Sequence, residues 1–386
     1  MSARRSPDGT ALLCLVVLSN TFCIGAFSPL LPEIGRTKAL ADWQLGVLAG
    51  SFGFARMLAD VPAGLLAGRR LGTSLVLSPA VLLAGILLLG AAGPFPVLVL
   101  GRILVGFGHT LGMVASLTAI LQEDRGPSAS MRLNVFEFSG MLGVLGGLGG
   151  VGLVPERWGW PASLLLASSP LLATFAICPA LLRRFPDQPR RAPAAGSREA
   201  SAGPPAPTPP IVWTMFAVGA LMGLAWSAVS QFLIPLRGTR EFGLERGGVS
   251  RLLGLAQLVD LIVLLPVGWL ADRVGRVAVL GGVVAVLGVG VWGAGLGSYG
   301  PFVAGCALLG LGMAGWMLPL GVVREHIELR TLAWRTGLYR VGVDATAFLG
   351  PLICGLLGEA HTGAFIALIG LAAVVSGARL VWRGLV

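Results

Sequence analysis

Charge is scarce in this sequence of 386 residues, because only 12% of them are Asp, Glu, Lys or Arg. Soluble globular proteins carry roughly a quarter charged residues, so about half of the expected charge is missing. A larger core does not explain the deficit, because the surface of a soluble domain must still be wetted. A surface that faces lipid does explain it, and 55% of the residues are hydrophobic.

Residues that carry chemistry are also few. The five cysteines have no CxxC spacing, and all of them fall in apolar segments (Cys14, Cys23, Cys178, Cys306 and Cys354), so we expect neither disulfides nor a metal site. The chain shows no Walker loop, no HExxH motif and no nucleophilic triad. Two GxGxxG stretches, at 288–293 and 310–315, lie inside apolar segments and follow no strand. We therefore predict no enzyme, no cofactor, no metal and no transport driven by ATP.

Long apolar segments recur along the whole chain. A helix that crosses a bilayer needs about 20 mainly apolar residues. Twelve such segments stand between charged residues or Pro and Gly: 10–32, 43–67, 73–93, 96–121, 131–154, 161–182, 211–235, 246–271, 276–297, 300–323, 335–358 and 361–383. They lack the alternation of membrane strands. We predict an all-α polytopic membrane protein with twelve transmembrane helices.

The two halves of the chain are related by a shift of about 204 residues. The stretch 64–67 matches 268–271, and each begins two residues after a proline. Three glycines of the fourth segment recur in the tenth: Gly101, Gly106 and Gly108 against Gly305, Gly310 and Gly312. We predict two parallel six-helix repeats, 1–182 and 211–386, with a binding site between them at mid-membrane. Residues 183–210, rich in Pro, Ala and Arg, should form a disordered cytoplasmic linker.

The net charge of +10 would suit a nucleic-acid-binding protein, but its distribution points elsewhere. With the N-terminus inside, the inner loops and tails hold about three times as many basic residues as the outer loops. This bias predicts that both termini are cytoplasmic and that the arginines set topology and do not bind nucleic acid. We expect a monomer, embedded in the lipid bilayer of the inner or plasma membrane.

Between the eighth and ninth segments the chain reads Gly268-Trp-Leu-Ala-Asp272-Arg273-Val-Gly275-Arg276. This stretch matches the GxxxD-R/K-x-G-R/K loop signature of the major facilitator superfamily, residue for residue. The chain resembles that family over nearly its whole length, and the resemblance implies solute transport by alternating access.

Two further stretches fit the same resemblance. The fourth segment holds Arg102, Gly106 and Gly108 in the family's RxxxGxG spacing, and the resemblance implies that Arg102 takes part in proton coupling. The counterpart of the loop signature is degenerate, since Gly64 is followed by glycine in place of the acid, and then by Arg69 and Arg70.

The loop signature predicts a gate on the cytoplasmic side. We expect Asp272 to meet the N-terminus of 131–154 in the other half, where a carboxylate is stabilised by the helix dipole. Arg273 and Arg276 have Glu325 and Glu328 as acidic candidates, and the repeat shift relates Glu328 to Asp124, a candidate partner for Arg69 or Arg70. The competing interpretation is that these arginines only fix topology.

Ionisable residues inside the segments are costly and usually functional. Arg56 with Asp60 and Arg340 with Asp344 are i,i+4 pairs that can neutralise themselves, so a structural pair and a transport role are equally supported. Asp260 and Glu137 lack such a partner on their own helix, and we predict them as proton carriers. The repeat shift relates Arg56 to Asp260, which would allow an attraction between the halves.

The remaining cavity candidates are polar or aromatic residues within the segments. A mostly apolar pocket with a few polar anchors suits a small ligand, and packing is the competing interpretation for each of them: Asn20, His109, Trp226, Gln231, Gln257, Trp316 and Tyr339. The Gly-rich run 140–152 lies where drug/proton antiporters of the family carry Gly-Pro, but here Gly146 and Gly147 stand there.

These observations predict a secondary active transporter that moves a small organic solute. Proton-coupled export is the first interpretation, on the basis of Arg102, the buried acids and the Gly-rich fifth segment, and the drug/proton antiporters are the closest branch. The alternative is proton-coupled or facilitative uptake of a sugar, an organic acid or a similar metabolite. A membrane receptor or scaffold that does not transport is a third interpretation.

Overall fold

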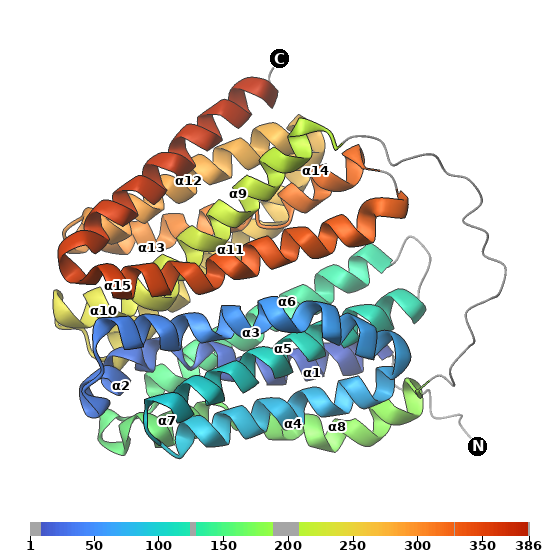
Figure 1. Cartoon of the computed structure of the whole chain (residues 1–386), viewed down its shortest axis with the longest axis horizontal. Helices are drawn as coiled ribbons and strands as arrows, with labels where there is room; N and C mark the ends of the chain where they lie inside the picture. Colours follow the sequence, from blue (N-terminus) through green and yellow to red (C-terminus); the bar gives the residue numbers. More distant parts are fainter. Residues whose placement is uncertain (1–8, 124–128, 188–207, 328, 385–386) are drawn as a thin grey trace.

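The computed structural model describes residues 9–123, 129–187, 208–327 and 329–384. Every regular element in these residues is a helix, which confirms the predicted all-α class. Long runs of Leu, Val, Ala and Gly form these helices, because a backbone in lipid must satisfy its hydrogen bonds within the element itself. The helices make two bundles that lie side by side (Figure 1).

The first bundle comes from the first half of the chain. Its helices are α1 (Gly9–Gly25), α2 (Leu31–Lys38), α3 (Asp42–Arg69), α4 (Leu71–Gly90), α5 (Phe95–Glu123), α6 (Ala129–Leu153), α7 (Gly159–Ala167) and α8 (Leu171–Arg184). The 3-10 turns η1 (Ser28–Leu30) and η2 (Glu156–Trp158) precede α2 and α7. A turn at 168–170, which contains a proline, separates α7 from α8.

The second bundle comes from the second half. It consists of α9 (Pro210–Trp226), the π-helix η3 (Ser227–Leu233), α10 (Ile234–Arg240), α11 (Arg246–Val274), α12 (Arg276–Leu296), α13 (Tyr299–Met313), α14 (Leu318–His326) and α15 (Leu329–Gly384). Helix α15 is interrupted at Gly358, whose φ of 64° lies in the left-handed region that glycine adopts readily.

In the described part of the chain, ten helices are long and apolar enough to cross a membrane. The predicted number of twelve is not confirmed by this count. Two features bear on the difference. The last of the ten, Trp334–Gly384, contains the break at Gly358. Helix α3 is 28 residues long but is not among the ten, and it carries four charged residues (Asp42, Arg56, Asp60 and Arg69).

The end of α8 and the start of α9 lie on the same side of the two bundles as the start of α1 (Figure 1). We call this the linker side. The opposite side, which holds the turns 39–41 and 241–245, is the far side.

The prediction of a disordered linker from residue 183 onward is wrong for its first residues. Helix α8 continues to Arg184, and the apolar ring of Phe185 is buried in a cluster with Leu71 and Leu181. Asp187 then accepts hydrogen bonds from the backbone N–H (3.0 Å) and the hydroxyl (2.5 Å) of Thr73 at the start of α4. These hydrogen bonds hold the pKa of Asp187 below its ordinary value.

Candidate transport site

Four charged residues meet where α3 of the first bundle crosses α15 of the second. Arg56 lies 2.9 Å from Asp344, and Arg340 lies 3.2 Å from Asp60. The prediction of i,i+4 pairs within each helix is therefore wrong, because each arginine contacts the aspartate of the other helix. The close approach has a local cause at Gly53, where a Cβ would lie 2.8 Å from the Ala347 carbonyl carbon. We call Arg56, Asp60, Arg340 and Asp344 the central quartet.

The positive and negative side chains of the quartet differ in their exposure. The arginine side chains are 26% and 33% exposed (Arg56 and Arg340), whereas the side chains of Asp344 and Asp60 are 2% and 7% exposed. Both carboxylates lie at the same crossing of α3 and α15, each against one of the two arginines. Among the described residues, Oδ2 of Asp344 is buried without a hydrogen-bond partner. The guanidinium groups thus form the accessible part of the site, and the carboxylates lie behind them.

Two further candidates belong to the same region. Glu137 on α6 and His109 on α5 both lie within the electrostatic reach of Arg56 and Arg340. The His109 ring also packs on Phe52, with ring centroids 5.4 Å apart. The Arg56 guanidinium carbon lies 5.6 Å from the centroid of the same Phe52 ring, so this ring joins His109 to the surroundings of the quartet.

Asp260 lies outside this group. It is buried on α11, and Gln257 donates a long hydrogen bond of 3.4 Å to it from the preceding turn. The predicted attraction between Asp260 and Arg56 is not observed, because Arg56 pairs with Asp344. The repeat places Arg56 and Asp260 at related positions, but related positions need not be in contact.

Arg102 is almost fully buried on α5 and has an aromatic environment. Its guanidinium carbon lies 3.7 Å from the centroid of the Phe27 ring and 5.0 Å from that of Phe52. Its Nε and one terminal nitrogen have no hydrogen-bond partner among the described residues. Cation–π contacts with two rings are the stabilising interactions that this charge has in place of a carboxylate.

Other predicted cavity residues serve the packing of helices. Asn20 accepts a 3.0 Å hydrogen bond from Thr174, which joins α1 to α8. Tyr339 is buried with its ring against Phe216, 5.7 Å between centroids. Trp316 is half-buried in the turn between α13 and α14.

Trp226 and Gln231 lie at the π-helix η3, which the sequence does not predict. Such a wide turn often marks a functional position in a helix. Here Ser227 of η3 donates a hydrogen bond of 3.3 Å to the carbonyl of Thr346 on α15. The π-helix therefore packs against the helix that carries Arg340 and Asp344.

The Gly-rich run on α6 is a surface for close packing against α1. A Cβ at Gly147 would lie 2.0 Å from the Phe22 carbonyl oxygen, and one at Gly143 would lie 2.2 Å from that of Leu18. Small residues allow membrane helices to approach in this way. The run thus has a packing role, and the predicted likeness to an antiporter motif stays a prediction.

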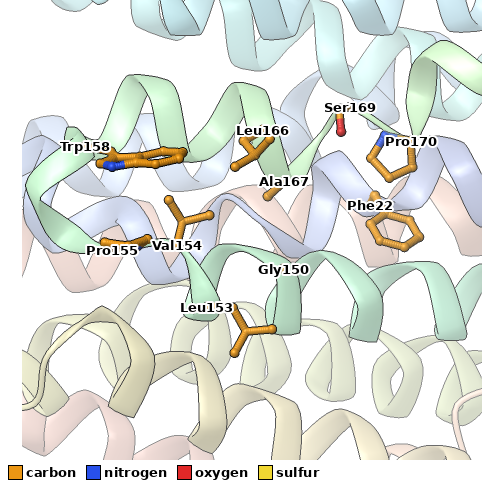
Figure 2. A pocket seen from close by; sticks show the side chains of 10 residues that line it. All are labelled: Phe22, Gly150, Leu153, Val154, Pro155, Trp158, Leu166, Ala167, Ser169 and Pro170. Carbon is orange, nitrogen blue, oxygen red and sulfur yellow. The ribbon is translucent and has the colours of Figure 1, made fainter.

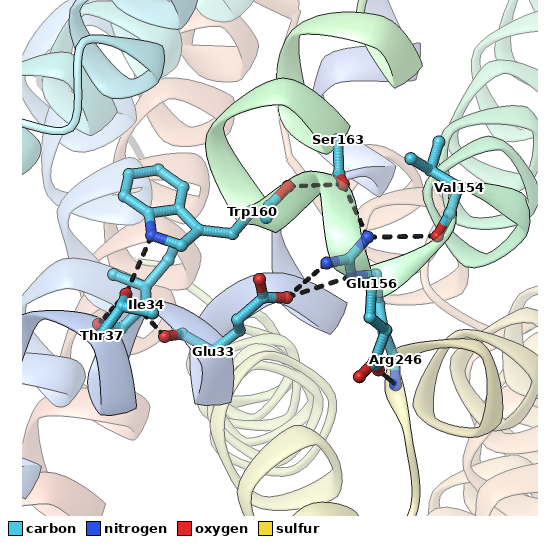
Figure 3. Close-up of polar contacts among 9 residues, drawn as sticks. Glu33, Ile34, Thr37, Val154, Glu156, Trp160, Ser163 and Arg246 are labelled. Atoms are coloured by element: carbon cyan, nitrogen blue, oxygen red, sulfur yellow. Dashed lines mark hydrogen bonds and ion pairs between the residues drawn. The ribbon is translucent and has the colours of Figure 1, made fainter.

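The strongest link between the bundles lies on the far side, at the first residue of α11. The Arg246 side chain is almost fully buried, and it contacts Glu33 at 2.5 Å, the Ser163 hydroxyl at 2.6 Å and the Val154 carbonyl at 3.2 Å. Its backbone N–H donates to Glu156 at 2.6 Å. Figure 3 shows how these groups of the first bundle converge on the one arginine.

A second link lies beside it. Arg240 contacts Asp42 at 2.6 Å across the bundles, and Glu359 of its own half at 2.9 Å. We call Glu33, Asp42, Arg240 and Arg246 the far-side gate. Sequence reasoning took these arginines only as topology signals. The internal repeat offered a clue to charged residues that link the halves on this side, because the shift of 204 relates the basic Arg246 to the acidic Asp42.

The linker side is different, because the described residues show no ion pair between the bundles there. Arg276 contacts Glu325 at 2.7 Å, which is one of its predicted partners, and Asp272 lies 3.5 Å from Arg276. The predicted contact of Asp272 with the first half is absent among the described residues. A Cβ at Gly64, Gly68 or Gly268 would meet nothing within 4 Å.

Other parts of the loop signature have local roles. Gly275 has a φ of 112°, which favours glycine at this position. Arg273 stacks over Trp269, 4.1 Å from the ring centroid. Arg70 lies near Asp187, and Arg69 is exposed at the end of α3. The predicted partners Asp124 and Glu328 lie outside the described residues, but the neighbouring Glu123 contacts Arg184 at 2.6 Å.

A cavity of about 370 Å³ opens between the far end of α6 and the α7–α8 region (Figure 2). Its lining is almost entirely apolar, with Ser169 as the hydroxyl-bearing member. None of the charged residues described above lines it. The cavity is therefore separate from the central quartet and lacks groups that would select a polar solute.

Comparison with known proteins gives a consistent result. The model of the Major Facilitator Superfamily matches residues 13–250. Polyol transporter 5 of Arabidopsis thaliana is 28% identical over 174 residues, which are 42% of this chain and 31% of that protein. Solute carrier family 2, facilitated glucose transporter member 10 of Mus musculus is 30% identical over 152 residues, 38% of this chain and 27% of that protein. The alignments thus span less than a third of these relatives.

Solved transporter structures share the fold. A bacterial homolog of the human lysosomal transporter Spinster, in an inward-facing and unoccupied conformation, has a TM-score of 0.74 at 14% identity, covering 100% of this chain and 94% of that one. The nucleoside transporter NupG has a TM-score of 0.68 at 13% identity, covering 98% of each chain. Because the family model matches more than half of its residues, the chain belongs to the Major Facilitator Superfamily.

Proposed function

We propose that this chain is a secondary active transporter that moves a small polar metabolite by alternating access, with proton coupling, in the inner or plasma membrane. The observation that carries the proposal is the uneven distribution of links between the bundles. Ion pairs hold them together at the centre and on the far side, whereas described ion pairs on the linker side stay within one bundle. Rocking of one bundle against the other needs such a set of separable links.

The positive-inside bias supports a cytoplasmic linker side, and the lack of described ion pairs between the bundles there suits a conformation that opens towards the cytoplasm. In the opposite conformation the far-side gate would separate and the loop signature would bring Asp272 against the first bundle. Proton coupling is supported by the acids of the central quartet and by Glu137, which lie where the two bundles meet. Asp260 and Arg102 are both buried but contact none of the quartet residues directly among the described contacts, so they remain secondary candidates for this role.

The solute is better described as a metabolite than as a drug. The matched relatives are named as a polyol transporter and a glucose transporter, and the Gly-rich run that suggested an antiporter has a packing role. Uptake of a sugar, an organic acid or a related metabolite is therefore preferred to drug export. A receptor or scaffold that does not transport is disfavoured, since a static bundle would have no use for charges at mid-membrane.

The proposal is tested with purified protein in liposomes that hold a pH gradient. A pH-sensitive dye reports the collapse of the gradient as sugars, polyols, organic acids and drugs are added one at a time. We expect collapse with a polar metabolite, and its sign at known protein orientation separates symport from antiport. Exchange of a labelled metabolite without any proton movement would contradict proton coupling. The absence of both metabolite exchange and proton movement would contradict transport.

A further inference from the structure

The central quartet has an accessible positive surface. The arginine side chains are several times more exposed than those of their aspartate partners, so a solute that reaches the quartet from solvent meets two guanidinium groups first. Guanidinium groups bind carboxylates through paired, charge-assisted hydrogen bonds. This arrangement suits a solute with a carboxylate better than a solute that carries only hydroxyl groups.

An anion that takes the arginines leaves two aspartates without counter-charge. Asp60 and Asp344 lie at the same crossing of α3 and α15, and Oδ2 of Asp344 is buried and unpartnered among the described residues. Two adjoining carboxylates out of water cannot both remain ionised. One of them must therefore take a proton, which then lies between the two carboxyl groups.

Three other ionisable residues lie around the quartet: Glu137, His109 and Arg102, whose guanidinium carbon lies 5.0 Å from the centroid of the Phe52 ring that Arg56 also contacts. Glu137 from α6 lies within the field of both arginines, so it adds negative charge next to an incoming anion. His109 from α5 lies there too, and it adds no counter-charge while it is neutral. Arg102 favours an incoming anion and Glu137 disfavours it, so the need for a proton rests on the Asp60–Asp344 pair itself.

We propose that the central quartet binds a hydroxylated organic carboxylate, such as a sugar acid, at Arg56 and Arg340, and one proton at the Asp60–Asp344 pair. The inference rests on the proposed function and specifies its substrate class and proton site. Upon binding, both ion pairs open, the carboxylate takes the guanidinium groups, and the proton comes from water. The loaded quartet then holds two positive and two negative charges, so the anion and the proton cross together without net charge.

The test compares gluconate with sorbitol, which share a hydroxylated carbon chain and differ in the carboxylate at one end. The full chain is placed in liposomes, and labelled gluconate and sorbitol are followed. We expect gluconate counterflow, and about tenfold accumulation per unit of pH gradient, as one proton per anion requires. Accumulation should not change when valinomycin and potassium set a membrane potential. Sorbitol should show neither counterflow nor accumulation.

Variants then assign the roles. Asp344→Asn resembles the protonated acid and should keep gluconate counterflow while losing the tenfold accumulation. Arg340→Gln should lower gluconate counterflow at least tenfold, with partial recovery in Arg340→Lys. Arg251→Gln, on an exposed position of α11, is the matched control and should behave as the parent. Retained counterflow in Asp344→Asn also shows that this variant is folded.

Three results would overturn the inference. Sorbitol counterflow without gluconate counterflow would show a neutral substrate, with the proposed transport intact. Gluconate accumulation that follows the membrane potential would contradict the transport of one proton with each anion. Counterflow of neither compound would exclude a hydroxylated carboxylate, and the pH-gradient screen with other solutes then reports separately on whether the chain transports at all.

Discussion

Arg56 and Arg340 each lie against an aspartate of the opposite bundle, at 2.9 and 3.2 Å. Removing one partner of a buried ion pair costs about 3–5 kcal/mol, because the other charge is left uncompensated. The cost is much smaller when a ligand or a proton replaces the departing partner. The quartet is therefore a link between the bundles that can open at low cost when a ligand or a proton replaces one of its partners.

A double-mutant cycle can measure whether each arginine is paired with the aspartate of the other bundle. We expect Arg56→Gln and Asp344→Asn to be non-additive by about 1 kcal/mol, as contacting residues are, and Arg56→Gln with Asp60→Asn to be closer to additive. Unfolding in mixed micelles gives the free energies. A larger coupling between Arg56 and Asp60 would restore the pairing within one helix.

At this scale the sequence identifies the residues but not their partners. All four members of the quartet are visible in the sequence as charges in apolar segments. From the sequence alone, i,i+4 pairing within each helix would neutralise them as well as pairing between the helices. The choice between the two pairings depends on how closely α3 and α15 cross, which is set by contacts such as that of Gly53 with Ala347. Arg246 is harder to find, because it lies at the first residue of a helix, where an arginine is ordinary.

The high glycine content of helix α6 determines how closely this helix packs against α1. Some of its glycines face α1 so closely that a methyl group at Gly147 would overlap the Phe22 carbonyl, whereas one at Gly149 would meet nothing within 4 Å. We expect Gly147→Ala to destabilise the protein by about 1–3 kcal/mol through overpacking, and Gly149→Ala to be neutral or slightly stabilising. Thermal unfolding of the two variants measures the difference, and equal shifts would contradict the α1–α6 contact.

The start of α4 carries a pH-dependent contact. Hydrogen bonds from Thr73 lower the pKa of Asp187 relative to its ordinary value of 3.8. A carboxylate with a lowered pKa in the folded state contributes stability above the ordinary pKa and loses it as the pH falls through the lowered value. We expect Asp187→Asn to melt at a lower temperature than the parent at pH 7, and the difference to disappear in acid below about pH 4. A difference that persists unchanged in acid would contradict the role of the charge.

Elements are the level at which the sequence predicts most. The segment 96–121 corresponds to α5 and 276–297 to α12, within a few residues at each end. What it cannot predict are the interruptions inside the segments: the π-helix η3 and the turns at 168–170 and 314–317. These depend on tertiary contacts, such as that of Ser227 with Thr346, and not on local propensity.

The whole molecule is divided into two bundles whose links differ between the two sides. Arg246 closes the far side through four groups of the first bundle. We expect Arg246→Ala to raise the alkylation rate of a cysteine placed at Ser250, which is buried against the Leu148 carbonyl of the first bundle, at least severalfold, since the gate opens more often. Arg251→Gln should leave the rate unchanged. An unaltered rate in Arg246→Ala would show that the gate is held by other contacts.

Alternating access is the central claim, and pulsed electron spin resonance tests it most directly. One pair of spin labels is placed on the far side at Ala41 and Glu245, and another on the linker side at Arg69 and Val274, all of them exposed. On addition of a transported solute, we expect the far-side distance to lengthen in a fraction of molecules and the linker-side distance to shorten in the same fraction. Distances that stay fixed on both sides, or that change in the same direction, would contradict the account.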